Sequence, residues 1–544
     1  MRNLSVLLFA FTLIVPAFAD EAHHHEMPAS GNYGTVHFPT SCSAAAQPKF
    51  ERAVAILHSF GYETARKAFE GVAQQDTHCA MAYWGVAMTQ YHGLWRQVWP
   101  AEGKAAVDKA RAVIAGNAKA TARERAYIEA LGNIFDQSAT PLPKRELAYE
   151  QAMAKLYADY PNDHEATIFY ALALDVDAPP TDKTYANQKK ARDILVPIFK
   201  QEPNHPGLAH YIIHVSDFPP LAADALSAAR RYAQIAPSSP HAQHMPSHIF
   251  TRLGLWDEAI ASNRASAASA ERDQLATNSA EALGQRMHAL DYLEYAYLQE
   301  GRYVDAREIV ILAKRVGEEG VGGSTAKGKG MNAIGGYADA AIPARFALER
   351  HEWAEAAALP DPTGMTANDA ITWYAKGLGL AHTIDVEELA RDTARVRAVV
   401  GKLAAIRDHL SGSGDAYWAN QVEIQRLQVL AWAEGAEQDM DGALQHARAA
   451  ADLEDATEKA PVTPGPVLPA RENLAQMLIL MGMQKTAMPE LEKVLETSPN
   501  RLNPMAALAS IARDFGDAEK AKLYQAKVDE LKRKTILKQV SAPK

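Results

Sequence analysis

The sequence predicts an all-α protein built as an α-solenoid of helical hairpins, and three observations support this prediction. Alanine-rich amphipathic stretches run through most of the chain, whereas the alternating pattern of a half-buried strand is nearly absent. Small residues recur 34 positions apart, as at Ala191, Ala225 and Ala259 and again at Ala487 and Ala521. A fixed period of this length is typical of a repeat architecture, in which each unit buries its apolar face against the next.

The period and its small residues resemble the tetratricopeptide repeat (TPR), and the resemblance covers roughly residues 46–535. It implies TPR-like hairpins stacked into a right-handed superhelix whose first helices line a concave groove. Four segments look more narrowly like a group of exported bacterial TPR proteins and, more distantly, like the family of tetratricopeptide repeat protein 38. These segments are Phe50–Ala73, Cys79–Trp95, His205–Asp217 and His241–Trp256.

The N-terminus predicts export. Arg2 precedes an apolar stretch, and Ala17-Phe18-Ala19 fits the small-x-small site of a signal peptidase, so residues 1–19 are expected to be a signal peptide and Asp20 the mature N-terminus. No later stretch is apolar enough for an integral membrane segment. The protein is therefore expected to be exported, to the periplasm or outside the cell.

The remaining chain divides into five predicted parts. An irregular N-terminal arm is followed by two TPR-like arrays, which a Gly-rich loop separates, and by a short tail. The predicted bounds are 20–45 for the arm, 46–314 for the N-terminal array, 315–337 for the loop, 338–535 for the C-terminal array and 536–544 for the tail.

Charge and motifs exclude several classes of partner and cofactor. The net charge of −10 argues against a nucleic-acid partner. Gly323 to Lys329 nearly matches a phosphate-binding loop, but Gly330 replaces the Ser or Thr that would bind Mg²⁺, so no nucleotide is expected. A CxxCH haem motif is absent. Cys42 and Cys79 are the only cysteines, and in an oxidising compartment they are expected to form one disulfide.

Histidines form the most informative pattern. His210 and His214 are four residues apart, as are His244 and His248, and the second pair follows the first by 34 residues. Residues four apart share one face of a helix. The two pairs are therefore predicted to face one space, and the next repeat adds Asp291 beside them.

Three interpretations of this cluster remain open. The first is a metal site with His210, His214, His244, His248 and Asp291 as ligands or orienting groups, holding Zn²⁺ or copper. The second is a groove in which the histidines hydrogen-bond a ligand or peptide without metal. The third is purely structural packing. Duplication of a repeat alone explains the register, so the second pair is not independent evidence.

The TPR resemblance also implies a ligand-binding face. Residues at the repeat positions that contact ligands in the family would bind a protein, peptide or small molecule in the concave groove. They are His58, Trp84, Met88, His92, His241, His288, Tyr295 and Glu472.

The sequence favours a binding scaffold over an enzyme. HExxH, GxSxG and a strand-borne GxGxxG are all absent, so no catalytic residue is assigned. The alternative is a metal-dependent hydrolase or oxidase that uses the histidine cluster, because an open position on a bound metal ion can activate water.

Overall fold

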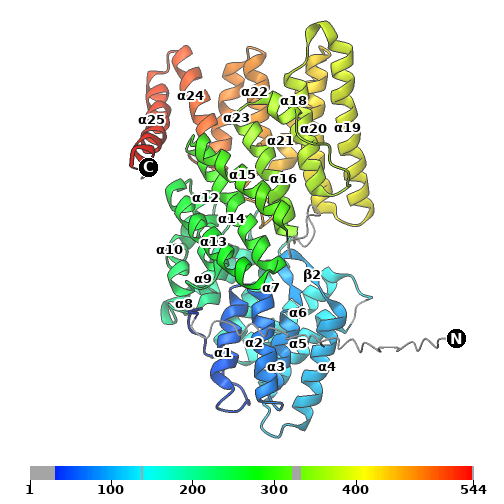
Figure 1. Cartoon of the computed structure of the whole chain (residues 1–544), viewed down its shortest axis with the longest axis vertical. Coiled ribbons are helices and arrows are strands. Elements are labelled where there is room, and N and C mark those ends of the chain that lie inside the picture. The colour runs from blue at the N-terminus through cyan, green and yellow to red at the C-terminus, as the bar shows by residue number, and fades with distance from the viewer. Residues whose placement is uncertain (1–30, 137–138, 321–332, 542–544) are drawn as a thin grey trace, which may run out of the picture. The chain divides into compact units, whose positions relative to one another are not determined.

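Helical hairpins follow one another along almost the whole chain in a computed structural model, which describes residues 31–136, 139–320 and 333–541 (Figure 1). The first helices are α1 (Gln47–His58), α2 (Tyr62–Gln75), α3 (Ala80–Met88), α4 (Pro100–Gly116), α5 (Ala122–Phe135), α6 (Leu142–Asp159), α7 (His164–Val176), α8 (Ala186–Gln201), α9 (Pro206–Val215), α10 (Leu226–Ile235), α11 (Pro240–His244), α12 (Pro246–Arg252) and α13 (Trp256–Thr277).

The later helices are α14 (Ala280–Gln299), α15 (Tyr303–Glu319), α16 (Ala333–Glu349), α17 (Trp353–Ala357), α18 (Ala367–His382), α19 (Leu389–Gly412), α20 (Ala416–Ala436), α21 (Met440–Ala456), α22 (Ala470–Leu480), α23 (Gln484–Thr497), α24 (Leu502–Asp514) and α25 (Ala518–Ser541). Two short strands, β1 (Tyr91–His92) and β2 (Gln97–Val98), pair antiparallel between α3 and α4. Among the described residues these are the only strands.

The prediction of an all-α array of TPR-like hairpins is confirmed. Each helix packs mainly against its neighbours in sequence, as α13 does against α14 and α19 against α20. The repeated alanines explain how the helices approach each other, because Ala191, Ala225, Ala259 and Ala487 are all fully buried. A methyl group at a crossing point allows a shorter distance between helix axes than a larger side chain would.

Local sequence fixes where the histidine-bearing helices begin. Pro206 and Pro240 occupy first-turn positions of α9 and α11, where a missing N–H is tolerated. The preceding residues, His205 and Ser239, accept a backbone N–H of the first turn. Pro246 then interrupts the helix after Met245, because its ring cannot donate to the preceding turn. The polar cap and the proline at each start therefore fix where α9 and α11 begin.

Several predicted bounds are corrected. Residues 315–319 belong to α15 and residues 333–337 to α16, so the predicted loop 315–337 is too long at both ends. The predicted tail 536–544 begins inside α25. Residues 1–30 and 321–332, which include the predicted signal peptide and the near-match to a phosphate loop, lie outside the described residues.

Distant repeats also pack against one another, which an open superhelix does not predict. α1 contacts α9, α14 contacts α24, and the segment after α21 reaches back to the first half of the chain. Lys183 lies 2.7 Å from Glu458, and the Trp256 indole donates to the carbonyl of Asn500. These contacts cover surfaces that were predicted to line a concave groove.

One disulfide links the N-terminal arm to the helical array. Cys42 is bonded to Cys79, with their Cα atoms 4.5 Å apart, so the arm is tied to the start of α3.

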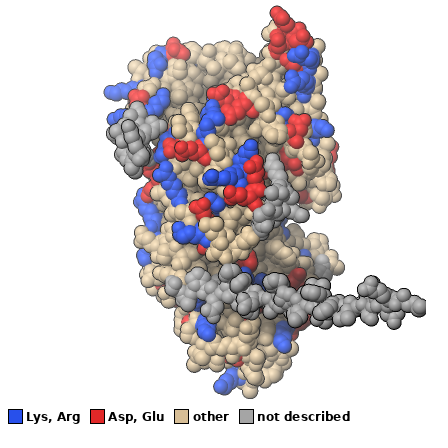
Figure 2. All heavy atoms as spheres, viewed as in Figure 1, with Lys and Arg blue, Asp and Glu red and all other residues tan. Residues whose placement is uncertain are grey.

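Acidic and basic side chains are interspersed over the face shown in Figure 2. None of the described helices combines the length and the apolar character needed to cross a bilayer.

Candidate metal centre

Six histidines from four helices come together in the interior. The six are His210 and His214 of α9, His241 and His244 of α11, His248 of α12 and His288 of α14. All six side chains are buried, and the most exposed, His214, keeps only 7% of its surface accessible. Because a buried polar atom requires a partner, the atom that each ring nitrogen faces decides what the cluster can do.

The first histidine group consists of His210, His214 and His241, with one ring nitrogen from each lying within 4.8 Å of the other two. Nε2 of His210 is 3.0 Å from Nε2 of His241. The opposite nitrogens face oxygens: Nδ1 of His210 is 2.6 Å from the carbonyl of His58, and Nδ1 of His241 is 3.3 Å from Oε1 of Gln285. Nε2 of His214 has no hydrogen-bond partner among the described residues.

These oxygens determine where the protons are. A neutral imidazole has one N–H and one lone pair. Because a carbonyl only accepts, Nδ1 of His210 donates and its Nε2 presents a lone pair, and the amide of Gln285, with its oxygen toward His241 as it lies in the structure, places His241 in the same state. Two lone pairs that face each other at 3.0 Å repel. A metal ion bound by both, and by the unpartnered nitrogen of His214, would turn this repulsion into ligation.

The second histidine group, His244, His248 and His288, repeats this arrangement. Nε2 of His244 lies 2.9 Å from Nε2 of His248, while the ring of His288 packs 4.1 Å from that of His244. Nδ1 of His244 is 2.6 Å from Oδ1 of Asn263, and Nδ1 of His248 is 2.9 Å from Oδ2 of Asp217.

The protons of the second group follow from the same reasoning. The amide of Asn263 is held in one orientation, because its Nδ2 donates to the carbonyl of Ala259, so its oxygen faces His244. A carboxylate oxygen accepts from His248. Both Nδ1 atoms therefore carry the hydrogen, and both Nε2 atoms present lone pairs to each other. A neighbouring group that fixes the tautomer of a histidine in this way is typical of metal ligands.

Asp217 is itself held by two cations. Lys459 Nζ lies 2.6 Å from Oδ2 of Asp217, and Nε of Arg252 lies 2.9 Å from its Oδ1. Burial alone would raise the pKa of this carboxyl, but Lys459 and Arg252 hold the pKa well below its usual range. Asp217 is therefore an ionised acceptor that orients His248.

Burial also keeps the histidines in the form that binds metal. It lowers the pKa of His241 to about 3 and holds the pKa values of His210, His214, His244 and His288 well below the usual 6.5. At neutral pH a proton cannot readily bridge the facing nitrogens. These lowered pKa values favour neutral rings, and only the neutral imidazole is a ligand.

The two groups follow one rule in the repeat. Each takes an HxxxH pair, which lies on α9 in the first group and spans α11 and α12 in the second, and a single histidine from the following repeat: His241 completes the first group, and His288 completes the second. The sequence-based prediction instead placed the two HxxxH pairs in one site and assigned His241 and His288 to the groove. The structure divides the six residues between two adjacent sites.

A third cluster, the carboxylate-centred group of His58, Glu165 and His205, is closed. Each carboxylate oxygen of Glu165 lies 2.8 Å from Nε2 of one histidine. Nδ1 of His58 is 3.0 Å from the Tyr211 hydroxyl, and Nδ1 of His205 accepts from the backbone N–H of Leu208. Every ring nitrogen has a partner of the opposite kind, so this group is complete without a metal ion.

Asp291 is a correction to the predicted ligand set. Its side chain lies on α14 but pairs with the buried Arg345 of α16 at 2.7 Å, and Glu294 contacts the same guanidinium at 2.8 Å. Although residues three apart lie near each other on a helix surface, the carboxylate of Asp291 is held by the guanidinium of Arg345 and does not belong to either histidine group. Asp291 therefore stabilises the packing of α14 against α16.

Most residues that were predicted to contact a groove ligand are inaccessible. Trp84 packs edge-on against Phe38 in the core, and Met88 is 4% exposed. Tyr295 and Glu472 both contact the buried Arg501. Among the other predicted residues, His58 belongs to the carboxylate-centred group, and half-buried His92 stacks on Tyr62 with ring centres 3.5 Å apart. The burial of these side chains leaves a groove ligand little to contact.

A cavity of about 430 Å³ adjoins the second histidine group. Lys459 and Thr463 form part of its wall. Lys459 contacts Asp217, and the carbonyl of Thr463 accepts from the Tyr292 hydroxyl. Since Asp217 and Tyr292 both lie against His248, one layer of side chains separates the cavity from the histidines.

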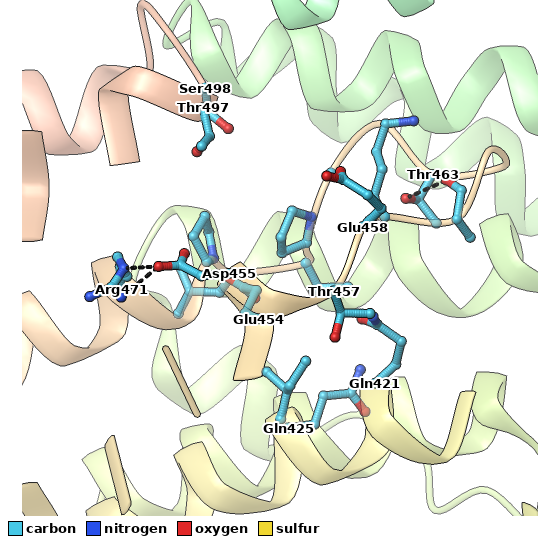
Figure 3. Close-up of a pocket in the computed structure, with 18 of the residues that line it drawn as sticks. Gln421, Gln425, Glu454, Asp455, Thr457, Glu458, Thr463, Arg471, Thr497 and Ser498 are labelled. Atoms are coloured by element: carbon cyan, nitrogen blue, oxygen red, sulfur yellow. Dashed lines mark hydrogen bonds and ion pairs between the residues drawn. The ribbon is translucent and has the colours of Figure 1, made fainter. Parts of the chain in front are cut away.

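The cavity wall combines apolar side chains with uncharged polar groups and paired ions. Figure 3 shows Gln421 and Gln425 of α20 reaching in from one side, opposite Thr497 and Ser498 at the end of α23. Oε1 of Gln425 is buried and has no hydrogen-bond partner among the described residues. The cavity therefore offers hydrogen bonds to a small polar molecule.

Comparisons with known proteins add little about function. No family model matches the chain, and no curated protein matches it either. Solved structures match over most of their length at low similarity. Human IFIT1 with m7Gppp-AAAA has 11% identity and a TM-score of 0.31, covering 83% of this chain and 90% of that one. The Cut9–Hcn1 complex of APC/C has 14% identity and a TM-score of 0.25, covering 90% and 96%. Similarity of this degree carries no inference about function.

Sequence reasoning missed the residues that orient the ligands. Asp217 follows His214 by three residues, a spacing that places a carboxylate close to the pair, so a signal for it existed. Asn263 and Gln285 come from α13 and α14 and have no distinctive spacing. Lys459 reaches Asp217 from 242 positions away in the sequence, which only the folded chain reveals.

Proposed function

We propose that this protein binds transition-metal ions, one in each histidine group, inside a TPR-like scaffold. One observation carries the proposal: in both groups two Nε2 atoms face each other at 3.0 Å or less, while each Nδ1 is anchored by an oxygen. Ligand nitrogens around a tetrahedral Zn²⁺ lie roughly 3.3 Å apart, as bond lengths near 2.0–2.1 Å require. The facing Nε2 atoms, 3.0 and 2.9 Å apart, are close to this spacing, and the third ring nitrogen of each group lies within 4.8 Å of them.

Elemental analysis tests the proposal. The full chain is purified without a histidine tag, and bound metal is measured before and after chelation and reloading with Zn²⁺ or copper. We expect two ions per chain in the wild type, one in His214→Phe, one in His288→Phe, and none in the double variant. His164→Gln is the control, because His164 pairs with Glu202 away from both groups. Wild-type protein that cannot be loaded, or a double variant that keeps two ions, would refute the proposal.

Export belongs to the same proposal. The signal-like N-terminus supports it, and so does the bond between Cys42 and Cys79, because such bonds persist in oxidising compartments. The mass of the mature protein from an exporting host checks this: a chain that begins at Asp20 is expected, whereas a chain that retains residues 1–19 contradicts it.

A metal-dependent enzyme, a hydrolase or oxidase, is the second candidate, and the cavity is the observation that favours it. Lys459 and Thr463 connect the cavity wall to the neighbours of His248, so a bound molecule would lie near the metal ions. Gln425→Trp would fill the cavity without touching a ligand. Any metal-dependent turnover should then disappear while the metal content stays at two; turnover that persists would exclude the cavity as the substrate site.

A further inference from the structure

The two histidine groups are close enough to act as one centre. His241 and His244 belong to the same turn of α11 but to different groups, and their ring centres are 6.2 Å apart. His214 and His248, one from each group, are 6.1 Å apart. Ions held by the two groups would therefore be neighbours, and a shared bridging ligand would require them to lie roughly 3.5–4 Å apart.

The ligand set is unusual in its charge. All six ligand atoms are neutral imidazole nitrogens, and no carboxylate or thiolate belongs to either group among the described residues. Asp217 is the carboxylate that touches a ligand, through Nδ1 of His248. Its oxygens already accept from Lys459 and Arg252, so its charge is compensated. The protein therefore offers little negative charge to offset that of the metal ions.

This charge favours one kind of ion. Two divalent ions would bring four positive charges into a buried site, where uncompensated charge is strongly unfavourable. Two copper(I) ions bring only half of this positive charge. Three nitrogen ligands are also enough to complete the coordination of a copper(I) ion. Zn²⁺ bound by three histidines normally takes a fourth ligand from water. Imidazole suits both metals, so the charge and the ligand number decide between them.

Building on the proposed metal-binding function, we propose that the two histidine groups hold a pair of copper ions that share one bridging oxygen ligand when oxidised. In the reduced state each group holds one copper(I) ion. When dioxygen oxidises the pair, each copper(I) ion gives up one electron, and the two electrons with two protons convert O₂ to hydrogen peroxide. A water molecule that loses one proton then supplies a bridging hydroxide, whose negative charge offsets part of the added positive charge.

Electron paramagnetic resonance (EPR) tests the pair. The full chain is stripped of metal, loaded with copper(I) without oxygen, and then exposed to air. Two copper(II) ions that share a bridge couple their spins, so we expect two coppers per chain and little of the corresponding EPR signal. Wild-type protein whose signal accounts for both coppers would overturn the proposal, as would loading with only one copper.

A ligand variant provides the matched comparison. His214→Phe removes one ligand of the first group, so the chain should keep one copper and show the full signal of a single copper(II) ion. His164→Gln should behave as the wild type. If zinc fills both groups but oxidised copper shows no coupling, metal binding stands and the copper pair fails; if neither metal binds, both proposals fail.

Discussion

The carboxylate-centred group and the two histidine groups look alike by proximity but differ in their hydrogen bonds. All three bring potential ligands within 4.8 Å of one another. Around Glu165 each donor meets an acceptor, whereas in the histidine groups lone pairs meet lone pairs. A cluster of ligand-type residues thus becomes a candidate metal site only when the partners of every nitrogen leave lone pairs that converge on one another.

The largest loss of stability is expected from a substitution in the carboxylate-centred group, in which every ring nitrogen has a partner. Glu165→Gln removes the negative charge that both His58 and His205 contact. The amide oxygen can still accept from one histidine, but the amide NH₂ group cannot accept from the other. Breaking a buried ionic group typically costs about 3–5 kcal/mol. Chemical denaturation should show a loss of that order in the free energy of unfolding of the metal-free protein.

The control for this variant is Glu202→Gln, which alters a partly exposed pair with His164. It should cost less than about 1 kcal/mol. Equal losses in the two variants would mean that the Glu165 group has no special role in stability.

The difference between closed and open groups also explains what the sequence could predict. The 34-residue period and the buried alanines determine the hairpins, so the architecture follows from local pattern. His210, His214, His244 and His248 share a face because of their spacing, and they were found for that reason. Their division into two sites was not predictable, because it depends on how far α11 and α14 approach α9 and α12.

The wrong assignments have a physical origin as well. Asp291 was placed beside the histidines by repeat register, yet a buried arginine from α16 competes for its carboxylate. Trp84 and Tyr295 occupy positions that contact ligands in an open TPR groove. Here other helices cover them, and such packing between distant repeats leaves no trace in the local pattern.

Acidification should destabilise the metal-free protein next most strongly. Burial lowers the pKa of His241 to about 3 and the pKa values of His92 and His382 to about 4. In the unfolded chain the same groups take up protons near pH 6.5. Below pH 6.5 the unfolded state therefore binds more protons, and the free energy of unfolding falls as the pH drops toward 4, by at most about 1.4 kcal/mol per pH unit for each group.

This prediction is checked by measuring denaturation midpoints between roughly pH 7.5 and roughly pH 4.5, a range that spans the ordinary histidine pKa. Stability should be nearly constant at the upper end and decline below about pH 6.5. A flat profile across the range would show that these histidines are solvated in the native protein.

A smaller effect, on metal affinity, is expected at Asp217, which orients His248. Asp217→Asn keeps the shape of the side chain but replaces an acceptor that faces His248, Arg252 and Lys459. A loss of stability accompanies the substitution, because Arg252 and Lys459 lose the charge of their buried carboxylate partner. Loss of such an orienting group typically weakens metal binding by about 10–100-fold. Competition with a chelator should show this loss for one of two ions. Asp224→Asn, at an exposed pair with Arg192, should leave both affinities unchanged.

The smallest expected change in stability separates ligation from packing. Nε2 of His214 is buried without a partner among the described residues, so His214→Phe removes an unsatisfied atom. The metal-free variant should match or exceed the wild type, by up to about 1–3 kcal/mol. His210→Phe is the contrast, because it leaves the carbonyl of His58 without its donor and should destabilise.

The decisive measurement is the stability of both variants with and without metal. Saturating metal at roughly 100 times its dissociation constant should add about 2.7 kcal/mol per ion to the wild type. His214→Phe should lose the contribution of one ion although its metal-free fold is intact. If metal stabilises His214→Phe as much as the wild type, His214 is a packing residue, and the first histidine group is as closed as the one around Glu165.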